Sequence, residues 1–167
     1  MLNDEALVAA LLEVERHVAE AGWDQPARLF ALVPTAELIA AEPSLAAQLG
    51  ADHLPGHLSS IEQEGFHEGR DLVSALAHIA WPPSVTGCAL AVERSFLAAG
   101  LEGQIPDEGA AEFVATHPDR HDVRVVAGAV RGGARHSVAR LRKQPAELLG
   151  GAALVPGLAA ALATTLD

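Results

Sequence analysis

The sequence VRVVAGAVRGGARHSVARLRK at residues 123–143 constrains the fold of this chain more than any other segment. Two valine-bearing runs flank Gly132 and Gly133, and consecutive glycines favour a two-residue type I′ turn because both residues adopt positive φ there. The segment therefore predicts a β-hairpin in which Val126 faces Ala139. Since both faces of its first strand are apolar, that strand is expected to be central in a sheet and covered at least partly on both sides.

Hydrophobic periodicity and turn residues place the remaining elements. Helices are expected over residues 4–21, 35–42, 71–80, 106–114 and 154–166, and strands over residues 28–33, 58–64 and 85–97. Thr35 is expected to cap the second helix with its side chain. At 167 residues the chain is long enough for one hydrophobic core. This order predicts a single α+β domain over residues 1–167, with a mixed or antiparallel sheet that ends in the hairpin and is flanked by N- and C-terminal helices.

Positive charge is concentrated in the same hairpin. Seven of the 11 Lys and Arg residues lie between residues 120 and 143, so this segment carries about +6 in a chain whose net charge is −11. Three interpretations stay open: the arginines neutralise the chain's own acids, such as Glu62, Glu64 and Glu93; they meet an acidic partner or a second subunit; or they bind nucleic acid. The candidate partner-binding arginines are Arg124, Arg131, Arg135, Arg140 and Arg142.

Composition argues against two classes of partner. The acidic net charge disfavours non-specific binding to nucleic acid and to anionic membranes, and no aromatic residue follows Phe113 to stack on bases. No apolar run reaches about 18 residues without charges or helix breakers, so no membrane insertion is expected. The single cysteine, Cys88, is expected to be a buried, inert thiol in a reducing compartment. Because no signal peptide is visible, the expected location is the cytoplasm.

Both tryptophans follow the end of a predicted helix. Trp23 lies in the segment Gly-Trp-Asp and Trp81 in the segment Ala-Trp-Pro. Tryptophan often anchors interfaces, which makes both residues candidates for partner binding. Tryptophan also commonly packs a helix against a sheet, and that structural role is the alternative for each residue.

A second group of residues suggests a catalytic alternative. His117, Asp119 and His121 lie in one segment before the hairpin, and Glu62 and Glu64 point to the same side if their segment is a strand. Together these groups would suit metal-assisted or acid–base chemistry in a small enzyme. The chain lacks a phosphate-binding loop, an HExxH motif and a second cysteine, so neither a cofactor nor a resident metal is expected.

Six blocks of sequence carry a resemblance to known proteins. They are GWDQPARLFALVPTAELIAAEP (22–43), IEQE (61–64), IAWP (79–82), GCALAVER (87–94), HPDR (117–120) and LVPGLAAAL (154–162). In this order they resemble a family of small, uncharacterised actinobacterial proteins with no assigned activity. The resemblance spans nearly the whole chain and implies a cytoplasmic protein of a high-GC actinobacterium, but it brings no catalytic residues.

These observations favour binding over catalysis. The chain combines a basic hairpin with an acidic body and lacks a recognisable nucleophile motif, metal cage or phosphate loop. We therefore expect a non-catalytic cytoplasmic adaptor that acts through protein–protein contacts, with a homodimer as its expected assembly.

Overall fold

The fold is built around one antiparallel sheet. The computed structural model describes residues 4–45, 57–63, 66, 72–96, 109, 121–142, 144–151 and 156–166. Its strands are β1 (Arg28–Pro34), β2 (Leu58–Glu62), β3 (Gly87–Phe96), β4 (His121–Val130), β5 (Arg135–Leu141) and β6 (Gln144–Gly151). Its helices are α1 (Asp4–Ala19), α2 (Thr35–Ala41), α4 (Leu72–Ala77) and α6 (Pro156–Thr164), with a 3₁₀ turn η1 (Pro43–Leu45). The strand order is β2-β1-β3-β4-β5-β6, and every neighbouring pair is antiparallel.

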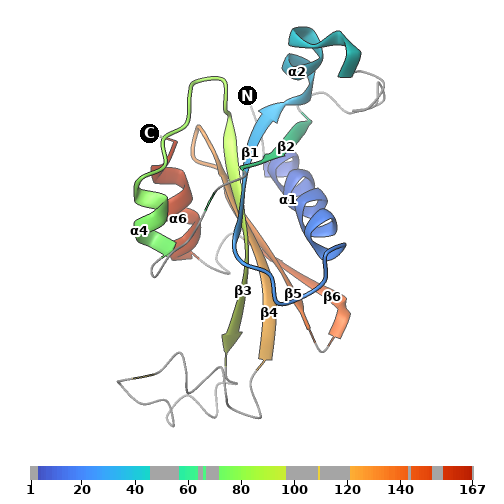
Figure 1. Ribbon diagram of the computed structural model, residues 1–167, viewed down its shortest axis with the longest axis vertical. Coiled ribbons are helices and arrows are strands. Elements are labelled where there is room, and N and C mark those ends of the chain that lie inside the picture. Colours follow the sequence, from blue (N-terminus) through green and yellow to red (C-terminus); the bar gives the residue numbers. More distant parts are fainter. Residues whose placement is uncertain are drawn as a thin grey trace.

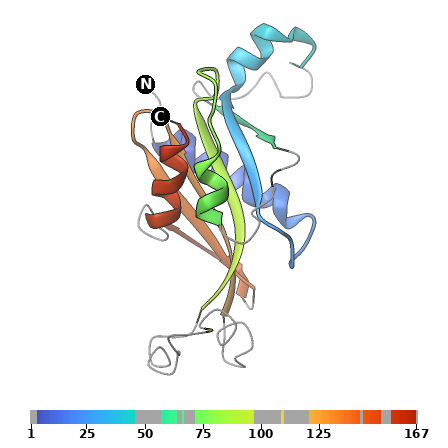
Figure 2. The same ribbon diagram turned by 60° about the vertical axis from the view of Figure 1, so that its left-hand side comes forward.

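Helices cover both faces of the sheet, which confirms the predicted α+β domain with helices at both chain ends. Helix α1 lies on one face, and α4 and α6 lie together on the other (Figure 1; Figure 2). The core is therefore split into two layers, one on each side of the sheet. Strand β4 lies between β3 and β5 and is buried on both faces from Val123 to Val130, as its apolar sequence predicts.

Helix α1 forms because its apolar residues recur every three or four positions. Leu7, Leu11, Val14 and Val18 make one buried stripe against the sheet. The helix ends at Ala19, two residues earlier than expected, and Gly22 follows with φ +83°, a conformation that glycine adopts without steric cost.

The hairpin exists, but its predicted register is wrong by one residue. Val126 lies opposite Val138, not Ala139, because the loop contains three residues, Arg131 to Gly133, instead of two. The amide N–H of Val130 donates to the carbonyl of Ala134 at 3.0 Å and closes this loop. A shift of one residue moves every side chain of the second strand to the other face of the sheet.

The corrected register changes where the arginines lie. The predicted register places Arg124 and Arg140 on opposite faces, whereas in the structure they are direct cross-strand partners on the face that α1 covers. Two neighbouring guanidinium groups beneath a helix require a carboxylate close to both.

Strand β6 is an element that the sequence analysis missed. Its sequence, QPAELLGG, contains a proline and two glycines, which disfavour a strand. The strand lies at the edge of the sheet and pairs only with β5, where a residue without an N–H, Pro145, is tolerated.

The predicted side-chain cap at Thr35 is also wrong. Pro34 occupies the N-cap position of α2 and makes no side-chain cap, and the hydroxyl of Thr35 is instead 2.6 Å from Nδ1 of His57 and 2.6 Å from the hydroxyl of Ser59. The backbone joins the same segments, because the N–H of Thr35 donates to the carbonyl of His57 at 3.0 Å. The start of α2 is thus fixed to β2 by tertiary contacts.

The helix expected over residues 106–114 lies outside the described residues, apart from Gly109, which forms a bend with φ +72°. Among the helices that are described, none is long and apolar enough to span a lipid bilayer.

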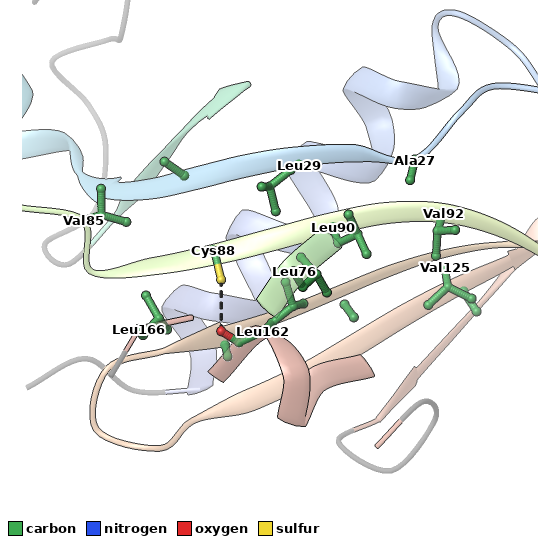
Figure 3. Packing of buried hydrophobic residues seen from close by; sticks show 14 of the residues in the cluster. Ala27, Leu29, Leu76, Val85, Cys88, Leu90, Val92, Val125, Leu162 and Leu166 are labelled. Atoms are coloured by element: carbon green, nitrogen blue, oxygen red, sulfur yellow. Dashed lines mark hydrogen bonds between the residues drawn. The ribbon is translucent and has the colours of Figure 1, made fainter. Parts of the chain in front are cut away.

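Cys88 lies in the layer beneath α6. Its thiol is fully buried and donates to the carbonyl of Leu162 at 3.5 Å (Figure 3). Burial raises the pKa of this thiol to about 11. Buried, apolar surroundings of this kind make a cysteine unreactive.

We expect the Cys88 thiol of the native protein to resist alkylation. At pH 8 a thiol of pKa about 11 is thiolate in about one molecule in a thousand, and the sheet and α6 exclude the reagent. Mass spectrometry after iodoacetamide treatment would show little label in native buffer and full label in denaturing urea. Complete labelling within minutes in native buffer would contradict this burial.

Candidate interaction site around the arginine hairpin

The hairpin arginines occupy different environments in the fold. Arg124 and Arg140 lie beneath α1, Arg142 lies at the open end of the hairpin, and Arg131 and Arg135 lie at its tip.

Arg124 is a buried structural residue, 2% exposed. Its Nη2 donates to the carbonyl of Gly22 at 2.6 Å, and its guanidinium carbon lies 4.4 Å from the centre of the Trp23 ring. Desolvation lowers the pKa of this guanidinium, and the charge of Glu15 opposes that effect. These contacts fix the connection between α1 and β1 to the sheet and leave Arg124 inaccessible to a partner.

Glu15 supplies the carboxylate that this pair of arginines requires. It is 2% exposed and projects from α1 toward the sheet. Its Oε1 accepts a hydrogen bond from Nε of Arg140 and lies 3.9 Å from Nη1 of Arg124. One carboxylate, itself almost fully buried, therefore serves two guanidinium groups.

Arg142 and Trp23 complete a polar corner beside this pair. Arg142 donates to both carboxylate oxygens of Asp24, at 3.0 and 3.2 Å, and its guanidinium carbon is 5.4 Å from the Trp23 ring centre. The hydrogen bond from Arg142 holds the pKa of Asp24 below its usual value. The carboxylate of Glu93 accepts from the backbone N–H groups of Asp24 and Gln25, at 2.8 and 2.9 Å. The Trp23 ring therefore makes cation–π contacts with two guanidinium groups of the same chain, those of Arg124 and Arg142.

Arg131 ties the hairpin tip to two other segments. Its guanidinium donates to backbone carbonyls of Val85 at 2.9 Å, of Trp81 and Pro82 at 3.2 Å, and of Leu166. These carbonyls belong to the segment before β3 and to the turn after α6. Arg131 is consequently held rigidly, with part of its surface exposed.

Trp81 has the structural role that the sequence left open. Its indole N–H donates to the hydroxyl of Thr165 at 2.9 Å, and its ring packs against the core layer that contains Cys88. The residue joins the end of α6 to the segment before β3.

Arg135 differs from the other arginines of the hairpin. It is exposed, and its guanidinium makes no ion pair or hydrogen bond with the residues that the structure describes. It borders a cleft of about 240 Å³ between the hairpin loop and α6. The lining residues are Val130, Arg131, Gly132, Gly133, Arg135, Ala163 and Leu166.

The structure does not bring the described members of the catalytic alternative together. Glu62 lies opposite Phe30, which lies opposite Ala89 of β3, whereas His121 lies opposite Phe96. These positions on β3 are seven residues apart, or roughly 23 Å at about 3.3 Å per residue.

Glu62 is instead part of an ion pair. It accepts from Nε and Nη2 of Arg28 at 2.7 and 2.6 Å, which holds the pKa of its carboxyl below the usual value. Glu64, His117 and Asp119 lie outside the described residues. Within the described ranges, no group of three or more His, Cys, Asp or Glu side chains is arranged to hold a metal ion.

Comparison with known proteins identifies the family. Residues 7–167 match the family model of PPA1309-like protein. The chain belongs to this family. The PPA1309-like family is uncharacterised and takes its name from a Propionibacterium acnes gene, which confirms the resemblance to small actinobacterial proteins. Searches of curated proteins and of solved structures found no match.

Sequence reasoning missed Glu15 in this PPA1309-like chain. The signal was present, because Glu15 follows Val14 directly and lies four residues after Leu11, at the border of the buried stripe of α1. A carboxylate at such a position predicts a buried cationic partner. The chain of hydrogen bonds from Glu13 through His57 to Thr35 was missed as well, since it depends on contacts between three distant segments.

Proposed function

We propose that the protein is a non-catalytic binding protein that holds an acidic segment of a protein partner at the tip of its hairpin. The observation that carries this proposal is Arg135, an exposed guanidinium without a partner in the described part of the chain, at the border of a cleft. Arginine in such a setting forms bidentate hydrogen bonds with carboxylates.

The surroundings of Arg135 suit a peptide better than a free ion. Val130, Ala163 and Leu166 give the cleft an apolar part, while Arg131 adds a second cation. Because backbone carbonyls hold Arg131 in place, little side-chain entropy would be lost when a partner binds there. An acidic residue next to an apolar one would satisfy both parts of the cleft.

The net charge of the whole chain would direct an acidic partner to the hairpin tip and away from the rest of the surface. With a net charge of −11, most of the molecule repels an acidic segment, whereas the tip attracts it. Electrostatic steering of this kind raises the rate of association and falls with added salt.

Two finer proposals accompany this function. We propose a cytoplasmic location, which the unpaired buried thiol of Cys88 suits, and a homodimer, for which a second acidic copy is one source of carboxylates. Analytical ultracentrifugation of wild type and Arg135→Glu tests the assembly: a dimer through this tip predicts that the variant is monomeric, and a dimeric variant places the contact elsewhere.

The experiment for the proposed function is affinity capture from the native host, followed by binding of the identified protein in purified form. We expect Arg135→Glu to weaken that purified interaction at least about tenfold at low salt, the effect of losing and reversing one well-placed interface charge. Arg16→Glu is the matched control, since Arg16 is also exposed and without a described partner but lies on α1, on the other face of the sheet. Equal losses in both variants, or none in either, would refute a role for the tip.

A further inference from the structure

A second cleft lies on the opposite face of the sheet from the hairpin-tip cleft. It has a volume of about 210 Å³ and is formed by one side of α1 and by strands β5 and β6. Its lining residues are Leu12, Glu15, Arg16, Ala19, Arg140 and Leu148. Two guanidinium groups and three aliphatic side chains thus surround one small space.

The cations of this cleft are not equivalent. Arg140 directs its Nε to the buried carboxylate of Glu15 and contributes positive charge at the inner wall, where about a quarter of its side chain remains exposed. Arg16 is exposed on α1 and has neither an ion pair nor a hydrogen bond with any described residue. With respect to the described residues, the donors of Arg16 are therefore available to a ligand.

Among the residues that line the cleft, two carry positive charge, Arg16 and Arg140, and one carries negative charge, Glu15. Arg140 is the direct cross-strand partner of Arg124, and like charges at such positions repel each other. Glu15 is the carboxylate that contacts both. With Arg16 at the edge of the cleft, the guanidinium groups at this place outnumber the carboxylate that lines it.

We propose that this cleft binds a small monocarboxylate with a short hydrocarbon chain. The ligand carboxylate would accept hydrogen bonds from Arg16 in the field of Arg140, and its hydrocarbon chain would lie against Leu12, Ala19 and Leu148. A doubly charged anion such as phosphate fits less well, because the carboxylate of Glu15 lines the cleft and the remaining wall is aliphatic.

The proposal is independent of the proposed function. The partner-binding cleft involves α6 and the hairpin loop, whereas this cleft involves α1 and the outer strands. Arg135 and Arg16 therefore serve as reciprocal controls, and either site can fail alone.

The test is a titration of the ¹⁵N-labelled full chain with hexanoate, followed by two-dimensional NMR. We expect saturable shifts of amides in α1 and β5, a dissociation constant at least tenfold larger in Arg16→Gln, and no change of that constant in Arg135→Gln. Hexan-1-ol, which lacks the charge, and inorganic phosphate, which lacks the hydrocarbon chain, should each bind at least tenfold more weakly than hexanoate.

Three results would overturn the proposal. They are the absence of saturable shifts with hexanoate, equal affinity of wild type and a folded Arg16→Gln variant, and binding of phosphate at least as tight as that of hexanoate. Because Arg16 is exposed and makes no described contact, its substitution is expected to leave the fold intact, which the dispersion of the same spectra would verify.

Discussion

Replacing Glu15 by glutamine is expected to destabilise the protein by about 3–5 kcal/mol, the range measured when one partner of a buried ion pair is removed. The substitution keeps the size of the side chain but removes the charge that Arg124 and Arg140 share. In a chain of this length the loss corresponds to a decrease in Tm of roughly 6–20 °C. Thermal unfolding followed by circular dichroism would measure it.

The matched control for Glu15→Gln is Glu20→Gln. Glu20 belongs to the same N-terminal segment, but its side chain is 77% exposed and lies 3.9 Å from His17 in a solvated pair. Its substitution should change the free energy of unfolding by no more than about 0.5 kcal/mol. Equal effects of the two substitutions would show that burial of Glu15 has no special energetic weight.

Apolar replacement of the whole group separates charge from packing. We expect the triple variant Glu15→Leu, Arg124→Met, Arg140→Met to be more stable than Glu15→Gln alone, because it leaves no uncompensated charge beneath α1. A triple variant that is less stable than Glu15→Gln would contradict this expectation. It would show that the contacts of Arg124 with Gly22 and Trp23 stabilise the fold by more than the uncompensated charge destabilises it.

The second large effect is expected for Gly87→Ala. A Cβ atom at this first residue of β3 would lie 2.6 Å from the backbone oxygen of Ala129 and 2.7 Å from Cγ1 of Val130. Neither neighbour can move without disturbing the pairing of β3 with β4 in the centre of the sheet. Overpacking of this kind costs about 1–3 kcal/mol, and contact with backbone places Gly87 at the upper end. Urea unfolding at equilibrium would measure the loss as a lower midpoint with an unchanged slope.

Gly150→Ala is the control for that substitution. Gly150 also lies in a strand, but a Cβ atom there would be 3.5 Å from Nε2 of His136, which is an ordinary van der Waals contact. Restriction of the unfolded chain should make this variant neutral or more stable by about 0.4–1 kcal/mol. If the Gly87→Ala variant were as stable as Gly150→Ala, the expectation would be wrong. Strands β3 and β4 could then move apart far enough to accommodate the added Cβ atom at little cost in stability.

The elements that sequence analysis identified are those with strong local patterns. Helix α1 has an uninterrupted apolar periodicity, and β3 and β4 are long runs of small and β-branched residues. Strand β6 was missed because Pro145 is tolerated in a strand mainly at the edge of a sheet, and an edge position is a property of the assembled sheet and not of the segment.

The site was harder to predict, because its geometry depends on one residue of loop length. A two-residue turn at Gly132 and Gly133 and the observed three-residue loop are both compatible with the local sequence, but they place Arg140 on opposite faces. The surplus of positive charge was evident from the sequence. Its division into buried and exposed arginines required Glu15, which is 125 residues away from Arg140 in the sequence and comes near only through packing of α1.

The position of α6 in the chain affects how the protein is made. All six strands precede α6, so a ribosome completes the sheet before it supplies the helix that covers Cys88 (Figure 3). Until Leu162 and Leu166 arrive, the part of this apolar face that α4 does not cover is open to water and to other chains. Arg131 then joins the turn after α6 to the hairpin loop, so that this contact can form only once α6 has been made.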